Sequence, residues 1–287
     1  MSLPTILICF DTDLQPSVFD AVVAADAGVE HLFRHGGVQP AEVRDLVYGA
    51  MFTRAPEDLK KTAVFIGGQD VAAGEELLQQ TTACFFGPLR VSVMLDPNGA
   101  NTTAAAAVLA ARKHVALEGA VATVLAATGP VGRRVVRLLA RENMHVRVAS
   151  RRRQRAEEVC TEIRQAVPEA SLQPCQTSNE AETASAVDGA QVIVAAGAPG
   201  VELLADQTRR QCGQLAVAID LSAVPPVGIG GIDPQDKAVR RDNHVCYGAI
   251  GVGGTKMKIH KAAIKRLFES NTLVLDADEI YAIGKQI

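Results

Sequence analysis

The stretch from Val121 to Arg153 constrains the fold of this chain more than any other. It opens with a short apolar run, Val121 to Ala126, which is typical of a strand buried on both faces. A glycine-containing turn follows, then apolar residues at helical spacing with arginines between them, and a second apolar run from His145 to Ala149. Strand, glycine turn, helix and strand form the first half of a dinucleotide-binding unit, whose helix N-terminus offers its N–H groups to a pyrophosphate.

The glycine turn departs from the usual pattern at its first position. It reads A-x-G-x-x-G, with Ala127 where dinucleotide-binding turns have their first glycine. Gly129 still allows the backbone to approach a phosphate, and Gly132 still allows the helix to pack closely on the strand. The pattern favours a dinucleotide site, and a parallel unit that binds no dinucleotide is the alternative.

The residues at the end of the second strand, about 20 positions further on, indicate which dinucleotide is bound. NAD enzymes usually carry Asp or Glu there, whereas this chain has Ser150-Arg151-Arg152-Arg153. A carboxylate would repel a 2′-phosphate, but guanidinium groups hold one bidentately. Three arginines at a helix start also oppose the helix dipole, which favours a bound anion over a solvated basic turn. The sequence therefore predicts NADP rather than NAD.

Length and composition bound the class of protein. The 287 residues suggest two domains or one large α/β domain, and 48% of them are hydrophobic, enough for a sizeable core. A net charge of −3 and the absence of Trp disfavour nucleic acid and membrane surfaces as partners. The six scattered cysteines favour free thiols in a reducing cytoplasm. With no secretory signal pattern and no run long enough for a membrane span, we expect a soluble cytoplasmic protein.

Apolar runs and turn residues alternate along the whole chain, which predicts a mainly parallel, doubly wound α/β fold. Helices are expected between the strands, one of them over 102–114 with Asn101 as its cap, and two more at the end, over 255–270 and 276–285. The expected strands are 3–10, 31–33, 62–66, 90–95, 121–126, 145–149, 172–175, 191–196, 215–219 and 245–250.

Two domains follow from this order of elements. We expect an N-terminal α/β substrate domain over residues 1–116 and a Rossmann-type NADP domain over 117–254. The helices over 255–287 come after the nucleotide sheet is complete, so we expect them to return and complete the first domain.

Polar side chains gather where the strands of the first domain end, the side of an α/β sheet at which ligands bind. Each has an alternative role as a helix cap or turn former. Together they would form a hydrogen-bonding lining for a polar, planar ligand. They are Asp11, Asp13, Gln69, Asp70, Asp96, Asn98, Asn101, Thr102 and Thr103.

A second candidate set is Lys256-Met257-Lys258-Ile259-His260. Lys256 and His260 are four residues apart, so they share one face of the expected helix. A lysine just after Gly253-Gly254, at a helix start, opposes the helix dipole, which favours a cleft with an anionic or electron-rich ligand over a solvated charge. The sequence has no G-x-S-x-G elbow and no H-E-x-x-H spacing, so neither a serine nucleophile nor a metal site is expected.

Long segments spread over nearly the whole chain carry a family resemblance. In the first part they are Phe10-Asp11-Thr12-Asp13, Pro16-Ser17-Val18-Phe19-Asp20, Phe65-Ile66-Gly67-Gly68, Phe86-Gly87-Pro88 and Asp96-Pro97-Asn98-Gly99-Ala100-Asn101-Thr102-Thr103. Further on they are Thr128-Gly129-Pro130-Val131-Gly132, the loop from Pro225 to Asp233, and Gly248-Ala249-Ile250-Gly251-Val252-Gly253-Gly254. On these segments the chain resembles the NADP-dependent methylene-tetrahydromethanopterin dehydrogenases of bacterial one-carbon metabolism. Ala127 departs from the family, whose turn normally begins with glycine.

The resemblance implies oxidation of N5,N10-methylene-tetrahydromethanopterin by NADP+ to the methenyl form and NADPH, and related enzymes also accept methylene-tetrahydrofolate. It further implies a homo-oligomer, a trimer or a multiple of one, with the pterin in the cleft between the domains. Phe19 and Lys256 match family positions close to the reacting ring. A hydride that leaves a carbon flanked by two nitrogens needs no general base, so we expect the protein to act by positioning and electrostatics.

The candidate site residues fall into three groups. Phe19 and Lys256 are the catalytic candidates, with Phe19 packed against the pterin and Lys256 orienting its polar groups. The substrate-binding candidates are Asp13, Asp20, Asn98, Asn101 and Thr102. The cofactor-binding candidates are Thr128, Gly129, Pro130, Val131, Ser150, Arg151, Arg152, Ala196, Gly197, Asp220 and Ser222.

Other functions stay open beside this one. An enzyme restricted to methylene-tetrahydrofolate would usually carry a Tyr-x-x-x-Lys pair, but Phe52 follows Tyr48 and Gly251 follows Tyr247 at that spacing. Of the three tyrosines, Tyr281 alone has a lysine there, Lys285, in the last expected helix. A shikimate-type dehydrogenase is disfavoured because its Lys and Asp constellation is absent from the first domain. A non-catalytic NADP-sensing protein is the alternative of a different class, and the polar strand ends argue against it.

Overall fold

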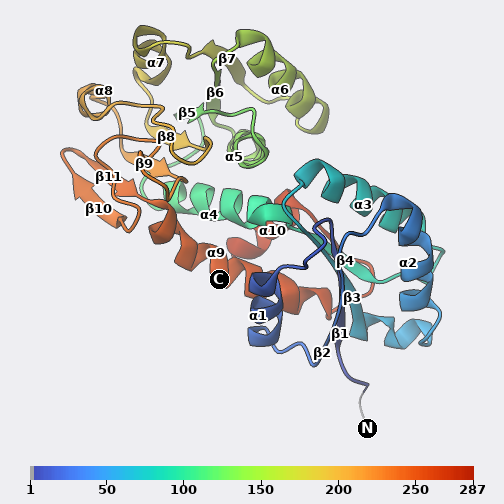
Figure 1. The fold of residues 1–287 in the computed structure, drawn as a ribbon. Helices are drawn as coiled ribbons and strands as arrows, with labels where there is room; N and C mark the ends of the chain where they lie inside the picture. Colours follow the sequence, from blue (N-terminus) through green and yellow to red (C-terminus); the bar gives the residue numbers. More distant parts are fainter. Residues whose placement is uncertain (1–2) are drawn as a thin grey trace. The chain divides into compact units, whose positions relative to one another are not determined.

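The computed structural model describes residues 3–287, which form two compact units (Figure 1). One unit is Met1–Thr102 with Met257–Ile287, and the other is Thr103–Lys256. The divisions fall inside helices α4 (Ala100–Arg112) and α9 (Ala249–Leu267), whereas the sequence analysis placed them at residues 116 and 255. The chain therefore passes from one unit to the other along a continuous helix each time, and not through a loop.

The first unit is built on a five-stranded parallel sheet in the order β12-β4-β3-β1-β2. The central strands are buried along nearly their whole length, which is why their sequences are continuous apolar runs. The sequence analysis missed β12, because a strand of two residues has no periodicity to detect. The strands are β1 (Ile6–Asp11), β2 (His31–His35), β3 (Thr62–Gly67), β4 (Ser92–Leu95) and β12 (Val274–Leu275).

Helices lie on both faces of this sheet (Figure 1). Helices α2 (Val43–Met51) and α3 (Val71–Ala83) pack on one face, in a core that includes Phe10 and Ile66. On the other face, the imidazole of His260 in α9 stacks on Phe65 with ring centroids 5.6 Å apart. The remaining helical segments are α1 (Val18–Asp26), α10 (Ala277–Gly284), and the 3-10 turns η1 (Pro40–Glu42), η2 (Pro56–Lys61) and η3 (Pro97–Gly99).

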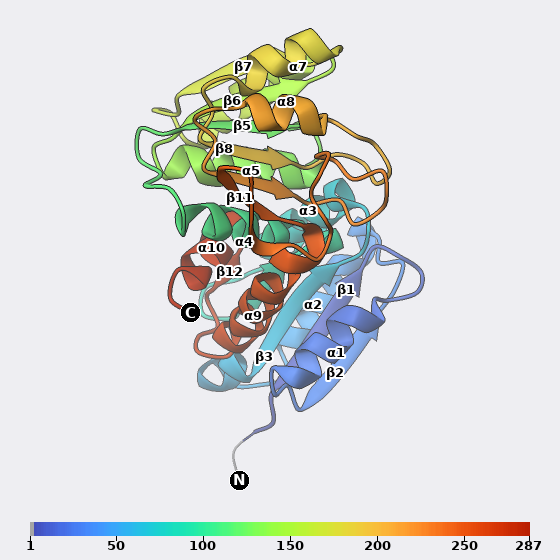
Figure 2. The same ribbon diagram turned by 90° about the vertical axis from the view of Figure 1, so that its left-hand side faces the viewer.

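The second unit contains a seven-stranded sheet in the order β10-β11-β9-β8-β5-β6-β7 (Figure 2). All neighbours are parallel except β10 and β11, so the predicted doubly wound, Rossmann-type α/β class is confirmed. The helices of this unit are α5 (Pro130–Arg141), α6 (Arg153–Ala166), α7 (Glu180–Val187) and α8 (Asp206–Gln211). Its strands are β5 (Val121–Leu125), β6 (His145–Ser150), β7 (Leu172–Gln176), β8 (Val192–Ala195), β9 (Val217–Asp220), β10 (Lys237–Arg241) and β11 (His244–Tyr247).

Two expectations for the end of this sheet were wrong. Strand β10 was not predicted, because four of its five residues are exposed and show no apolar alternation. The last strand does not reach residue 250: β11 ends at Tyr247, and α9 begins at Ala249 rather than at Thr255. Gly248 is needed between them, since a Cβ there would lie 2.1 Å from the carbonyl oxygen of Asp233.

Candidate dinucleotide and substrate sites

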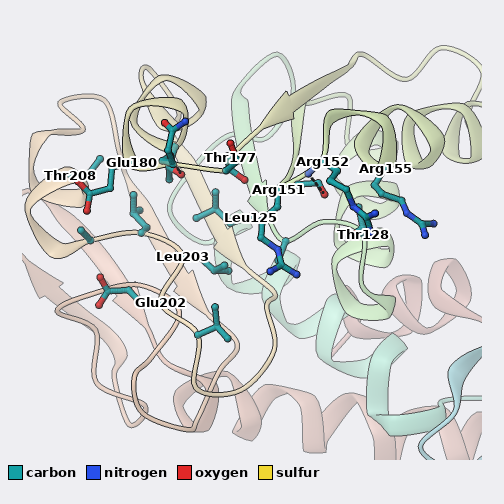
Figure 3. Close-up of a pocket in the computed structure, with 18 of the residues that line it drawn as sticks. Leu125, Thr128, Arg151, Arg152, Arg155, Thr177, Glu180, Glu202, Leu203 and Thr208 are labelled. Atoms are coloured by element: carbon teal, nitrogen blue, oxygen red, sulfur yellow. Dashed lines mark hydrogen bonds between the residues drawn. The ribbon is translucent and has the colours of Figure 1, made fainter.

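A cavity of about 540 Å³ lies in the second unit, at the carboxyl ends of β5, β6, β7 and β8 (Figure 3). The chain runs from β5 to β6 and β7 in one direction and continues with β8 and β9 in the other, so β5 and β8 flank the point where the strand order reverses. Crevices at this point are where open α/β sheets bind their ligands. Of the predicted cofactor residues, Thr128, Ser150, Arg151 and Arg152 line the cavity.

One side of the cavity is strongly basic. Figure 3 shows Arg151, Arg152 and Arg155 together on that side, and Arg133 also lines it. Arg155 forms a 3.3 Å ion pair with Glu158. Within residues 3–287, the guanidinium groups of Arg151 and Arg152 have neither a hydrogen bond nor an ion pair. Two unpaired cations beside a cavity are suited to a phosphate.

The turn between β5 and α5 has a strained backbone at one residue. Ala126, and not Ala127, adopts a positive φ of 53°. Gly129 occupies the N-cap of α5 without a side-chain cap, so the first N–H groups of the helix are available to an anion. A Cβ on Gly132 would lie 2.8 Å from the Cα of Ala127, which confirms that this glycine allows close helix–strand packing.

The other side of the cavity was missed by the sequence analysis. It is formed by the polar segment after β7 and by the loop between β8 and α8, and Figure 3 shows Glu180, Glu202 and Thr208 there. Asn179 caps α7 by accepting the N–H of Glu182 at 2.9 Å. The sequence located β7 correctly, and polar residues directly after it were the available signal. The lining residues on this side are Thr177, Ser178, Asn179, Glu180, Thr183, Val201, Glu202, Leu203, Leu204, Ala205 and Thr208.

The other predicted cofactor residues do not line this cavity. Gly129, Pro130 and Val131 form the start of α5, and a Cβ on Gly129 would lie 3.8 Å from the carbonyl oxygen of Ala196. Gly197 follows Ala196, and a Cβ at that position would lie 2.7 Å from Leu203.

Asp220 and Ser222 organise a loop. The buried carboxylate of Asp220 accepts the N–H of Ser222 at 2.9 Å and that of Ile229 at 2.8 Å. Burial raises the pKa of the Asp220 carboxyl, although these N–H groups partly offset the effect. The contacts close the glycine- and proline-rich loop after β9.

In the first unit, carboxylates meet at the ends of β1 and β3. Asp11 accepts the N–H groups of Asp13 and Ser17, both at 2.9 Å. A Cβ on Gly67 would lie 3.5 Å from the Asp20 carboxylate and 3.6 Å from that of Asp11, so these two side chains converge on Gly67. Asp13 in turn accepts the N–H of Gln69 at 3.3 Å. Of the predicted polar strand ends, Asp11, Asp13 and Gln69 therefore gather at this edge of the sheet, and Asp20 of α1 joins them.

The prediction that Asn101 caps the next helix was wrong. Asn101 is the second residue of α4, and the cap is the buried carboxylate of Asp96, which accepts the N–H groups of Asn101 at 2.9 Å and Thr102 at 3.0 Å. The amide of Asn101 donates to the carbonyl of Leu95 and to Asp276 of the C-terminal segment. Asn101 and Thr102 are fully buried, and Asn98 precedes them at a positive φ of 53°.

Phe19 lies on a face of α1 that is unexpectedly exposed. Val18, Phe19 and Val22 are apolar, yet they are 65%, 50% and 55% exposed, and Val23 and Ala24 are the buried pair. The ring of Phe19 lies 6.4 Å from that of His260, which stacks on Phe65. A half-exposed aromatic ring backed by two others is a suitable surface for a flat ring.

Lys256 lies well inside α9. The helix begins at Ala249, so the argument that Lys256 opposes the dipole at a helix start was wrong. Lys256 and His260 are on consecutive turns of this helix, as their spacing predicted.

Comparison with known proteins shows the family of the chain. A family model described as methylene-tetrahydromethanopterin dehydrogenase, N-terminal, matches residues 18–98. A protein of Methylorubrum extorquens strain AM1 named bifunctional protein MdtA is 42% identical over 98% of both chains. The NAD(P)-dependent methylenetetrahydromethanopterin dehydrogenase of the same organism is 30% identical over 94% of both chains. The chain belongs to the methylene-tetrahydromethanopterin dehydrogenase family. It is accordingly an enzyme of the dehydrogenase kind, and the resemblance seen in its sequence is confirmed.

The fold of this dehydrogenase also has more distant structural relatives. Shikimate 5-dehydrogenase from Listeria monocytogenes, solved with shikimate and NAD, aligns with a TM-score of 0.54 at 12% identity, over 97% of this chain and 95% of that one. At that identity the likeness concerns the fold alone. Among the helices of residues 3–287, none has the length and apolar composition that a membrane span requires.

Proposed function

We propose that this enzyme oxidises N5,N10-methylene-tetrahydromethanopterin with NADP+ as the acceptor, giving the methenyl form and NADPH. The observation that carries the proposal is the basic side of the cavity. Arg151 and Arg152 follow β6, where an NAD enzyme places a carboxylate, and their guanidinium groups are unpaired within the described residues. A 2′-phosphate would supply the missing partner. The relative named as an NAD(P)-dependent methylenetetrahydromethanopterin dehydrogenase supports both substrate and cofactor.

The residues around the cavity fit a dinucleotide phosphate. Thr128, Gly129, Pro130 and Val131 would hold the pyrophosphate at the start of α5, whose N–H groups point along the helix axis. Ser150, Arg151 and Arg152 would hold the ribose and its 2′-phosphate. Ala196 and Gly197, which directly follow β8, would border the turn between β5 and α5. Asp220 and Ser222 would act by closing the loop after β9. NADP, when bound, supplies the nicotinamide ring that accepts a hydride.

We infer that the first unit binds the pterin. The half-exposed ring of Phe19 would pack on it, and the carboxylates of Asp13 and Asp20 would accept its N–H groups. Asn98, which follows β4 and has a positive φ of 53°, would bind the polar groups of the pterin. Asn101 and Thr102 are buried, so their part would be to hold that segment through Asp96.

Lys256 would orient the polar groups of the pterin. The carbon that loses the hydride is flanked by two nitrogens, whose lone pairs stabilise the cation that forms. No proton has to be removed by the protein. The residues of the chain therefore bind and align the two rings, and alignment of this kind can lower a barrier by several kcal/mol, up to about 7–11 kcal/mol.

A spectrophotometric assay that crosses both methylene pterins with NADP and NAD tests the proposal. We expect the highest kcat/KM with methylene-tetrahydromethanopterin and NADP. Turnover of methylene-tetrahydrofolate alone would identify the folate-restricted enzyme instead. Tight NADPH binding without turnover of either pterin would identify a sensor.

Variants of Phe19, in the first unit, and of Lys256, the last residue of the second unit, test the pterin site. Phe19→Ala and Lys256→Ala should each lower kcat/KM for the pterin. Phe33→Ala is the matched control, because Phe33 is also 50% exposed in the same unit but lies on the edge strand β2. Unchanged kinetics in both test variants would remove these residues from the site.

We also expect a homo-oligomer, a trimer or a multiple of one, located in the cytoplasm. The oligomeric state rests on the family resemblance, and the cytoplasmic location rests on the composition of the sequence. Sedimentation of the purified protein would measure the oligomeric state, and a monomer would contradict it.

A further inference from the structure

Arg133 connects the turn after β5 with helix α6. Its Nε donates to the carbonyl oxygen of Thr128 at 3.1 Å, and its Nη1 pairs with the carboxylate of Glu162 at 2.6 Å. Thr128 belongs to the turn, Arg133 to the first part of α5, and Glu162 to the second half of α6. The guanidinium group is therefore held between two elements that both border the cavity.

At its start the turn is held by the N–H of Ala127, which donates to the carbonyl oxygen of Ala149 at 2.9 Å, and the residues after Ala127 are held less firmly. Ala126 adopts a φ of 53°, which an L-residue rarely does. The hydrogen bond from Gly129 N–H to the Ala126 carbonyl is long, at 3.4 Å. Gly129 carries no side chain that could cap the helix. The bond from Arg133 to Thr128 is thus a side-chain contact that fixes the direction of the peptide just before the N-terminus of α5.

We propose that Arg133, held by Glu162, is a positioning residue for the dinucleotide. It acts through the carbonyl of Thr128 on the turn whose N–H groups receive the pyrophosphate, and it ties that turn to α6, the helix that directly follows the 2′-phosphate arginines Arg151 and Arg152. This inference rests on the proposed NADP site. It differs from direct binding of a phosphate by Arg133, although Arg133 also lines the cavity.

Glu162→Gln separates the two roles, because it leaves the charge of Arg133 intact and removes its carboxylate partner. If Arg133 positions the turn, the variant weakens NADPH and NADH by the same factor, about threefold to tenfold, since both share the pyrophosphate. If Arg133 bound phosphate directly, loss of the competing carboxylate would leave affinity unchanged or increase it. Either of those results would overturn the inference.

Glu157→Gln is the matched control. Glu157 is also a half-exposed residue of α6, and its ion pair is with Arg153, which does not line the cavity. The readout is the fluorescence of NADPH and NADH on binding to the full chain, so it does not depend on turnover. We expect Glu157→Gln to bind both as the parent does, and thermal melting to show that both variants are folded.

Arg151→Ala, measured in parallel, separates failure of this inference from failure of the proposed function. If Arg151→Ala reduces the preference for NADPH while Glu162→Gln has no effect, the NADP site stands and the positioning role is wrong. If neither variant changes binding, the cavity is not the dinucleotide site, and both proposals are wrong.

Discussion

Replacing Arg209 with methionine removes a guanidinium group that joins three segments of the second unit. Arg209 lies on α8 and its side chain is 1% exposed. Its Nε donates to the carbonyl of Gly230 at 3.1 Å, and its Nη1 contacts Nε2 of His244. Its Nη2 pairs with Asp206 at 2.5 Å and with Asp242 at 3.2 Å. The loop after β9 and the β10–β11 pair are thus fastened to one helix.

The magnitude follows from which partners remain buried. The side chains of Asp206 and Asp242 are 36% and 39% exposed, so water can replace the arginine there. The Gly230 carbonyl and the His244 nitrogen would lose a buried donor, at about 1–3 kcal/mol each. We therefore expect Arg209→Met to lower the free energy of unfolding by about 2–6 kcal/mol, a range that includes the 3–5 kcal/mol or so typical of breaking a fully buried pair.

Arg210→Met is the matched control, because Arg210 pairs with the same two carboxylates. It lies 2.8 Å from Asp206 and 3.8 Å from Asp242, but its side chain is 57% exposed. Exposed pairs contribute about 0–1 kcal/mol. Thermal unfolding followed by circular dichroism should show a melting temperature about 4–24 °C lower for Arg209→Met than for the parent protein. Equal shifts in the two variants would refute the assignment of the energy to the buried contacts.

The remaining predictions concern the cofactor, pH and the turn. Arg151→Ala should raise KM for NADP by about tenfold or more and change KM for NAD little, because one charge-assisted phosphate contact is lost; equal effects would contradict a 2′-phosphate site. Burial, and then the charge of Arg209, lowers the pKa of His244 from its ordinary 6.5. Protonation of His244 therefore favours the unfolded state. The neutral imidazole stabilises the fold fully above pH 6.5, and this stabilisation is lost as the pH falls below 6.5. In urea unfolding, the free energy of unfolding of His244→Asn should depend less on pH below 6.5 than that of the parent. An unchanged pH dependence would contradict this role of His244. Ala126→Gly should raise the free energy of unfolding by roughly 0.5–1 kcal/mol, because a positive φ costs alanine more than the added chain entropy costs glycine; a less stable variant would show that the turn is unstrained.

Sequence patterns located most elements but misjudged features that depend on packing. The apolar runs gave the buried strands because a strand buried on both faces leaves little freedom in residue type. Helix α1 shows the limit of the same reasoning, since Val18, Phe19 and Val22 have core-like composition and are exposed. The exposed strand β10 has the opposite character and was missed.

The candidate cofactor site divides in a similar way. Arg151 and Arg152 were predicted because they directly follow a recognisable strand. Arg133 and Arg155 were not, because each lies inside a helix and reaches the cavity through helix geometry. Asn101 was assigned a capping role that belongs to Asp96, since both residues precede the helical pattern and the bend of the chain at η3 decides between them.

The sequence alone determined the parallel α/β class, the glycine turn before α5 and the basic end of β6, because each depends on residues adjacent along the chain. The tertiary structure decided the rest. Thr177 and Glu202 line the same cavity as Ser150, although α6 and β7 lie between Ser150 and Thr177, and α7 and β8 lie between Thr177 and Glu202. Asp276, near the far end of the chain, meets Asn101. Such contacts depend on how the sheets order their strands, and hydrophobic periodicity carries no information about that order.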